Sequence, residues 1–208
     1  MNKPSLTLER RFRKRGFGLV AGIDEAGRGA WAGPVVAAAV ILPLGRSDLR
    51  KVLKGVNDSK QLTAGQRVGL YPVICSVALA VGVGEAGPEE IDRNGIVPAT
   101  RAAMERAVAM LAVPPEALLI DAVDLRAVVD LPQHSLVRGD SISLSIAAAS
   151  IIAKVSRDRM MVKLDALFPG YGFWKHKGYG TALHQTALER LGVSETHRRS
   201  YRPVARVR

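Results

Sequence analysis

Cysteine is almost absent from the 208-residue sequence, which contains only Cys75. A disulfide bond within the chain is therefore excluded. Cys75 lies in the apolar segment 73–80, where we expect it to be buried as a small hydrophobic residue. The four histidines have no zinc-like spacing with it, which argues against a structural zinc site.

Long hydrophobic runs are also missing. The longest wholly apolar stretch covers residues 35–43, far short of the roughly 20 residues that span a bilayer. Asp24 and Glu25 interrupt the region that a signal peptide would use. We therefore expect a cytoplasmic protein without a membrane partner.

Several common catalytic and phosphate-binding motifs do not occur. The sequence has neither the G-x-x-x-x-G-K-[ST] phosphate loop nor the G-x-S-x-G elbow of serine hydrolases. Residues 27–32 formally match the G-x-G-x-x-A turn of dinucleotide-binding folds, with Asp48 at the position of a ribose-binding acid. A strand-like segment follows this turn instead of a helix, and Asp24-Glu25 would repel a pyrophosphate, so the context disfavours dinucleotide binding.

Acidic residues are scarce relative to basic ones. The chain has 19 Asp and Glu against 30 Lys and Arg, giving a formal net charge of +11. Such an excess favours a polyanionic partner, above all nucleic acid, although a basic charge that only aids solubility fits the composition as well. Residues 1–16 and 198–208 are particularly basic, and we expect the first of these segments to be a mobile lead-in.

Short apolar segments alternate with segments of helical periodicity. We expect the first two strands to form a hairpin across the glycine-rich turn, and residues 147–150 of the long helix to allow its close approach to a sheet. Lys154, Arg157 and Lys163 of that helix are expected to face solvent. The pattern predicts an α/β fold, a mixed β-sheet with helices on its faces. The expected strands are 17–23, 35–42, 73–83, 117–121 and 134–140, and the expected helices are 99–111, 143–168 and 182–191.

Four carboxylates follow strand-like segments: Asp24, Glu25, Asp121 and Asp140. A sheet fold can bring such residues into one site, and their hard oxygen ligands suit Mg²⁺ or Mn²⁺. Two such ions about 3.5–4 Å apart can activate water and stabilise the leaving oxygen of a phosphodiester. Acids that merely cap turns and strand ends are the structural alternative for each position taken alone.

Further residues fit a nucleic-acid substrate. The turn Gly27-Arg28-Gly29 would let a ligand approach the backbone, and its backbone groups could contact a 2′-hydroxyl. Lys60 in a polar turn could reach a phosphate, and Tyr179 between two glycines offers a stacking surface. Each motif taken alone is also compatible with an ordinary surface loop.

Taken together, these motifs closely resemble ribonuclease HII, the type 2 ribonuclease H family, in its bacterial form. The resemblance runs through most of the chain. Its motifs are Gly22-Ile-Asp-Glu-Ala-Gly-Arg-Gly29, Gly33-Pro-Val35, Asp58-Ser-Lys60, Leu119-Ile-Asp121, Gly139-Asp140, 147–158 and Gly178-Tyr-Gly-Thr181.

The resemblance implies a ribonuclease H-like catalytic domain at 17–168 and a C-terminal helical extension with a basic tail at 169–208. It also implies an endonuclease that cuts on the 5′ side of a ribonucleotide, in RNA/DNA hybrids and in duplex DNA with embedded ribonucleotides. The expected product ends are 3′-hydroxyl and 5′-phosphate, and the expected mechanism uses two metal ions with substrate bound. We expect a monomer without an obligate protein partner.

The resemblance also implies roles for individual residues. Asp24, Glu25, Asp121 and Asp140 are similar to the catalytic metal ligands, although Asp124 lies close enough to Asp121 to compete for the third position. Residues 27–29 correspond to the 2′-hydroxyl reader, Tyr179 to the ring that stacks on the adjacent deoxyribose, and Lys60 to a phosphate contact. Two other functions stay open: a different metal-dependent nuclease on this fold, and a non-catalytic basic nucleic-acid-binding domain.

Overall fold

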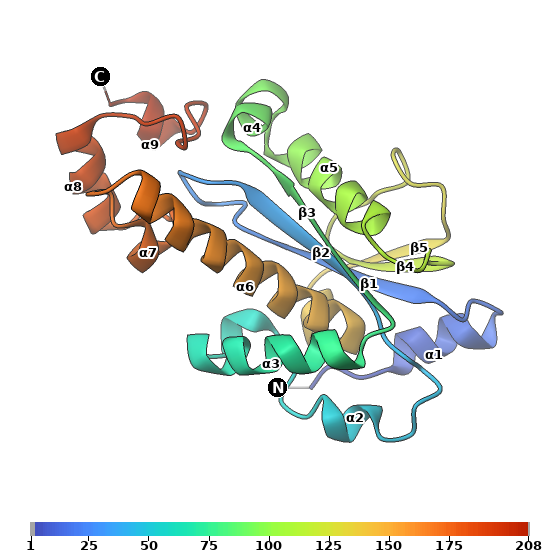
Figure 1. The fold of residues 1–208 in the computed structure, drawn as a ribbon. Helices are drawn as coiled ribbons and strands as arrows, with labels where there is room; N and C mark the ends of the chain where they lie inside the picture. The colour runs from blue at the N-terminus through green and yellow to red at the C-terminus, as the bar shows by residue number, and fades with distance from the viewer. Residues whose placement is uncertain (1–2, 208) are drawn as a thin grey trace.

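A single mixed β-sheet forms the centre of the computed structural model, which describes residues 3–207. Its strand order is β3-β2-β1-β4-β5 (Figure 1). The strands are β1 Val20–Ala26, β2 Val35–Ile41, β3 Ala80–Ala86, β4 Ala117–Asp121 and β5 Gln133–Leu136. The first three pair antiparallel, whereas β4 is parallel to β1 and β5 is parallel to β4. The predicted hairpin is therefore the β1–β2 pair.

Helices cover both faces of this sheet. The longer helices are α3 Ala64–Val77, α5 Ile96–Ala109, α6 Leu144–Leu167 and α8 Ala182–Leu191. The shorter ones are α1 Thr7–Lys14, α2 Leu49–Val52, α4 Pro88–Asn94, α7 Phe173–His176 and α9 Arg202–Ala205, with 3₁₀ turns η1 Ser59–Gln61 and η2 Gly139–Ser141. Helices α4 and α5 lie on one face, α3 and α6 lie on the other, and α7 to α9 gather near the end of α6 (Figure 1).

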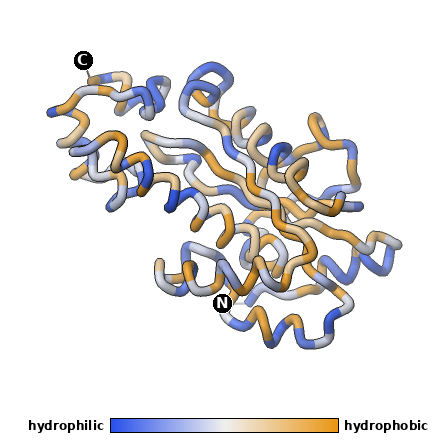
Figure 2. The backbone as a smooth tube through the Cα atoms, viewed as in Figure 1, coloured by the Kyte–Doolittle hydropathy of each residue, from blue (hydrophilic) through white to orange (hydrophobic). Residues whose placement is uncertain are grey.

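The core is divided between the two faces of the sheet. Every residue of β2 is buried, and its alternate side chains enter the two clusters, Ala38 on the α6 side and Ala37 on the α5 side. Hydrophobic residues concentrate in the central strands, while hydrophilic residues are frequent in the outer helices and loops (Figure 2). The predicted mixed α/β sheet is confirmed.

Helix α6 packs directly on β1. A Cβ atom at Gly22 would lie 2.2 Å from the backbone carbonyl carbon of Ser145, so only glycine permits this close approach. The side chain of Ser143 caps the helix by accepting a hydrogen bond from the backbone N–H of Ile146. The predicted helix is thus confirmed, but Arg157 is fully buried, contrary to the expectation that it faces solvent.

The strand predicted at 73–83 is wrong in its first half. Helix α3 extends to Val77, and β3 begins only at Ala80. A capping box between Thr63 and Gln66 begins the helix, and it is the sequence signal that identifies it. Cys75 is exposed on this helix rather than buried.

The first and last segments within residues 3–207 are packed against the rest of the molecule. The expected mobile lead-in instead contains α1, whose Glu9 and Phe12 are buried. At the other end, Phe173 and Leu188 belong to a small core that packs against Met161 of α6. Within residues 3–207, no helix combines the length and the apolar character needed to cross a bilayer.

Candidate active site

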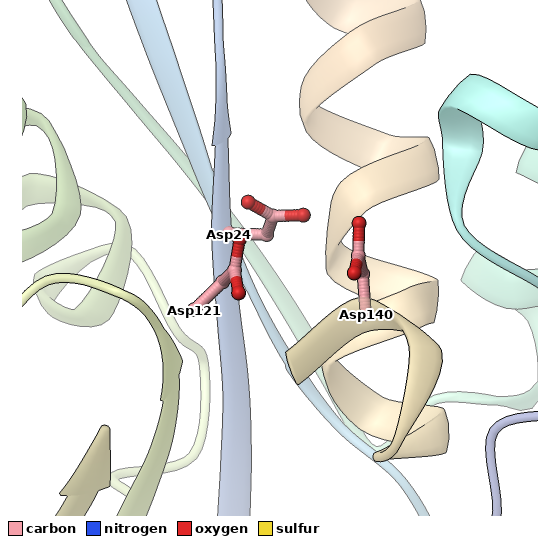
Figure 3. A group of neighbouring side chains, drawn as sticks. All are labelled: Asp24, Asp121 and Asp140. Carbon is pink, nitrogen blue, oxygen red and sulfur yellow. The ribbon is translucent and has the colours of Figure 1, made fainter. Parts of the chain in front are cut away.

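Three carboxylates meet at one end of the sheet. Asp24 lies on β1 and Asp121 is the last residue of β4, and the two strands are parallel neighbours. Asp140 comes from η2, the turn before α6. One oxygen atom of each side chain lies within 4.8 Å of the others (Figure 3). Three segments that are distant in sequence therefore deliver acids to one point.

Asp140 does not lie on a strand, contrary to the prediction of a strand at 134–140. Strand β5 ends at Leu136, and Arg138 then adopts a left-handed conformation with φ 58°. The backbone N–H of Gly139 donates a 2.7 Å hydrogen bond to Oδ1 of Asp121, which fastens the turn to the end of β4. This reversal of the chain brings Asp140 toward Asp24.

Asp24 and Asp140 are buried, and Asp121 is half-buried. Asp24 is only 3% exposed, and burial, followed by repulsion from Glu25 and Asp121, raises its pKa well above the usual value. Burial also raises the pKa of Asp140, and Asp58 adds to the effect. A set of crowded, hard oxygen donors of this kind fits a divalent cation such as Mg²⁺ or Mn²⁺.

Glu25 lies beside this group but is not part of it. In the β1–β2 hairpin Asp24 pairs with Ala38 and Glu25 with Ala37, so the two acids leave opposite faces of the sheet. Oε1 of Glu25 lies 3.2 Å from Nη1 of Arg28. Its Oε2 is buried and has no hydrogen-bond partner in the described chain. This oxygen can therefore accept a hydrogen bond from a ligand or bind a cation.

A cleft of about 260 Å³ joins Asp24, Glu25 and Asp121 to the predicted substrate-binding residues. Lys60 and Asp121 also line an adjoining cleft of about 540 Å³, which includes Asp140. Asp124 instead pairs with Arg126, 3.0 Å away, and does not belong to the three-acid group. The residues around the smaller cleft are Asp24, Glu25, Ala26, Gly27, Arg28, Gly29, Ser59, Lys60, Arg67, Asp121, Lys154 and Tyr179.

The glycine-rich turn presents free donors at this cleft. The carbonyl of Gly27 accepts a hydrogen bond from Ala30, which closes the turn. The carbonyl of Arg28 is already engaged by Arg198 and Tyr201. In the part of the chain that the structure describes, the backbone N–H groups of Arg28 and Gly29 donate to no other group. The turn can therefore donate hydrogen bonds to a ligand but has little capacity to accept them at Arg28.

Comparison with known proteins identifies the family. The family model for ribonuclease HII matches residues 21–204. A ribonuclease HII from Chloroflexus aurantiacus is 56% identical over 201 residues, covering 97% of this chain and 94% of the relative. The chain belongs to the ribonuclease HII family. It is accordingly a ribonuclease H, and its membership of this family supports endonuclease activity.

Solved structures support the same assignment. The crystal structure of ribonuclease H2 from Pyrococcus horikoshii OT3 matches with a TM-score of 0.76 and 27% identity, covering 91% of this chain and 96% of that one. The ribonuclease HII of Archaeoglobus fulgidus, solved in a complex with PCNA, matches with a TM-score of 0.74 and 28% identity over 88% of this chain and 95% of that one. The predicted ribonuclease H-like fold is therefore confirmed.

Two buried arginines behind the ribonuclease HII cleft were not predicted from the sequence. Arg157 and Arg198 are both fully buried and both donate hydrogen bonds to carbonyls around the hairpin loop. The centroid of the Tyr179 ring lies 5.3 Å from the Cζ atom of Arg157. Arginine in a helix or a basic tail is usually exposed, so no local signal distinguishes these two from surface residues.

Proposed function

We propose that this ribonuclease HII hydrolyses the phosphodiester on the 5′ side of a ribonucleotide, both in RNA/DNA hybrids and in duplex DNA with embedded ribonucleotides. The product ends would be 3′-hydroxyl and 5′-phosphate. The single observation that supports this most strongly is the cleft that holds Asp24, Glu25, Asp121 and the turn 27–29 together. The groups expected to cut and the groups expected to recognise ribose line the same cavity.

Asp24, Asp121 and Asp140, with Glu25 beside them, are the residues that would hold Mg²⁺ or Mn²⁺, two ions once substrate contributes its phosphate oxygens. Such ions supply a water of lowered pKa and stabilise charge on the leaving oxygen. The protein contributes the positions of its acids, which are fixed by β1, β4 and η2 before substrate arrives. Burial, followed by repulsion from neighbouring acids, raises the pKa values of Asp24 and Asp140, and a bound cation would oppose both effects.

Recognition of ribose follows from the free donors of the turn. A 2′-hydroxyl oxygen can accept hydrogen bonds from the N–H groups of Arg28 and Gly29, which have no partner among the described residues. A deoxyribose lacks this oxygen and would leave the donors unsatisfied on binding. Because the carbonyl of Arg28 is held by Arg198 and Tyr201, the turn keeps one conformation while it tests the sugar.

Two further side chains of the cleft would hold the substrate. Tyr179 lines the smaller cleft and would stack on the deoxyribose next to the ribonucleotide. Lys60 lines both clefts and would contact a phosphate. The net charge of +11 would attract the duplex to this face in a salt-dependent manner.

The deciding experiment uses labelled duplexes that differ only in having no, one or several consecutive ribonucleotides. Each is incubated with Mg²⁺ or with Mn²⁺, and the cut position and end groups are mapped. We expect cleavage only of the ribonucleotide-containing duplexes, 5′ to a ribonucleotide, with a ligatable 3′-hydroxyl. Equal cleavage of the all-DNA duplex would indicate another metal nuclease on this fold, and binding without cleavage in either metal would indicate a non-catalytic domain.

A pair of matched variants assigns the acids. Asp140→Asn should reduce single-turnover cleavage roughly a thousandfold, the effect of losing about 4 kcal/mol of transition-state stabilisation. Asp124→Asn, which changes an acid outside the three-acid group, should retain cleavage. Full activity of Asp140→Asn would contradict the assignment.

A further inference from the structure

Arg157 is a buried cation without an anionic partner. Its side chain is fully buried in α6, and it forms no salt bridge within residues 3–207. Burial lowers its pKa to about 10, so the guanidinium is still charged at neutral pH. Retaining a charge in the interior is costly unless it is hydrogen-bonded, and each of the three guanidinium nitrogens donates to a carbonyl here.

The guanidinium bridges two loops. Its Nε donates to the carbonyl of Pro34 over 2.8 Å and its Nη2 to that of Ala32 over 3.1 Å, both in the β1–β2 hairpin loop. Its Nη1 donates to the carbonyl of Lys177 over 2.9 Å, two residues before Tyr179. The planar fork of a single arginine thus fixes the spacing between the hairpin loop and the loop that carries the ring.

The same group contacts both proposed recognition elements. The Tyr179 ring lies 5.3 Å from its Cζ atom, a distance at which a cation attracts an aromatic face. A Cβ atom at Gly27 would lie 1.9 Å from its Nε, so the first residue of the turn rests directly on the guanidinium. Arg198 differs in this respect, because the two carbonyls that accept hydrogen bonds from its side chain, those of Arg28 and Gly33, both lie in the hairpin loop.

We infer that Arg157 is a positioning residue for sugar recognition, which holds the turn 27–29 and Tyr179 at one fixed separation. The turn tests the ribose and the ring tests the adjacent deoxyribose, so a fixed spacing makes the enzyme read the junction as a unit. This inference rests on the proposed function. Arg157 does not contact the three acids, and its effect is therefore expected on sugar discrimination and turnover, not on metal binding.

Arg157→Lys keeps the charge but loses the fork, and it is the informative variant. We expect single-turnover cleavage at a lone ribonucleotide to fall roughly a hundredfold, as for displacement of a binding element by about 1 Å. Mn²⁺ affinity without substrate, measured by calorimetry, should stay within twofold of the wild type. A stronger test is coupling: Tyr179→Ala should reduce discrimination between ribose and 2′-deoxyribose in the wild type and have little further effect in Arg157→Lys.

Two other variants separate positioning from stability. Met104→Ala creates a core cavity in α5 on the opposite face of the sheet and should lower the melting temperature without changing discrimination. Gly178→Ala would place a Cβ atom 2.4 Å from the carbonyl oxygen of Ala32, which separates the same two loops while Arg157 is kept. It should reproduce the defect of Arg157→Lys and keeps the proposal testable if that variant does not fold.

Failure of the positioning role and failure of the proposed function give different results. A wild-type enzyme that cuts all-DNA duplexes equally would end the proposed function itself. If the wild type requires ribose but Arg157→Lys and Gly178→Ala keep wild-type discrimination and its coupling to Tyr179, the positioning role is overturned. The positioning role is also overturned if the defects of these two variants are no larger than that of Met104→Ala at the same loss of melting temperature.

Discussion

The Nζ atom of Lys60, a residue proposed to contact phosphate, lies 3.5 Å from Oδ2 of the candidate metal ligand Asp140. The lysine side chain is 77% exposed, whereas that of Asp140 is only 3% exposed. Partial burial acts to lower the pKa of Lys60, but attraction by Asp140 and Asp24 outweighs it and the pKa is raised. Lys60 would therefore compete with a bound cation for this carboxylate.

Replacing this lysine should have two opposite effects. Lys60→Met removes the competing charge, so Mn²⁺ affinity without substrate should rise up to about fivefold, the equivalent of an exposed ion pair worth at most about 1 kcal/mol. Cleavage should nevertheless fall about tenfold through weaker substrate binding. Calorimetry and single-turnover kinetics measure the two effects. Lys51→Met, on the exposed surface of α2, should change neither, and reduced metal affinity in Lys60→Met would refute the competition.

Removing the charge of Asp24 should stabilise the protein while it abolishes activity. The pKa of Asp24 is raised by burial and repulsion, so ionising this carboxyl opposes folding when no cation is bound. We expect Asp24→Asn to raise the melting temperature in EDTA by a few degrees and to lose most of the stabilisation that Mg²⁺ gives the wild type. Thermal unfolding with and without Mg²⁺ measures both, and a lower melting temperature in EDTA would contradict the sign.

The parts of the site that were predictable lie within continuous segments. Asp24, Glu25 and residues 27–29 belong to one hairpin, and an apolar strand next to acids and glycines already indicates a ligand site. The position of Asp121 at the end of β4 follows from the same kind of pattern. The motifs that resemble ribonuclease HII extended this reading to Lys60 and Tyr179, both of which line the cleft.

The parts that were missed depend on long-range contacts. Arg157 is buried because the hairpin loop and the loop before Tyr179 cover α6 at this position, and helical periodicity contains no information about those contacts. Helix α3 was interpreted as a strand because its apolar run lacks a helical stripe, although the capping box at Thr63 marked its start. The sequence predicts a strand at Asp140 because the left-handed residue of this turn is Arg138 and not the neighbouring Gly139.

The N-terminal helix should support the segment that carries Asp140. Oε1 of Glu9 accepts hydrogen bonds from the Oγ of Ser143 and from both the backbone N–H and the Oγ of Ser145, at 2.6 to 2.9 Å. These groups form the start of α6, where an anion also interacts favourably with the helix dipole. Glu9→Ala should destabilise the protein by about 2–4 kcal/mol, because it removes these bonds and leaves the buried backbone N–H of Ser145 without its acceptor.

Urea unfolding measures this loss. Glu89→Ala, which removes an exposed glutamate from α4, provides the control and should cost less than about 0.5 kcal/mol. If residues 1–16 were a detached basic segment, Glu9→Ala would resemble that control. A Glu9→Ala protein of unchanged stability would therefore contradict the role assigned to α1.

Stability should also depend on pH through a pair of buried histidines. The backbone N–H of Ser194 donates to Nδ1 of His197, so the proton of His197 resides on Nε2, 3.0 Å from Nε2 of His184. His184 then uses its Nδ1–H to donate to the carbonyl of Tyr179. Burial first, then repulsion from neighbouring histidines, lowers the pKa of His184 and of His197 to about 4. The network is complete only when both rings are neutral.

The sign follows from proton binding. Because the unfolded chain takes up these protons near pH 6.5 and the folded chain only near pH 4, the contribution is fully present above about 6.5 and is lost as the pH falls toward 4. The acids with raised pKa change the stability with pH in the opposite direction. The test therefore compares the wild type with a His184→Gln variant, in which those acids are unchanged. The difference in unfolding free energy between the two should be largest at neutral pH and shrink toward about pH 4.5. A difference that stays constant across this range would show that the histidines do not titrate on unfolding.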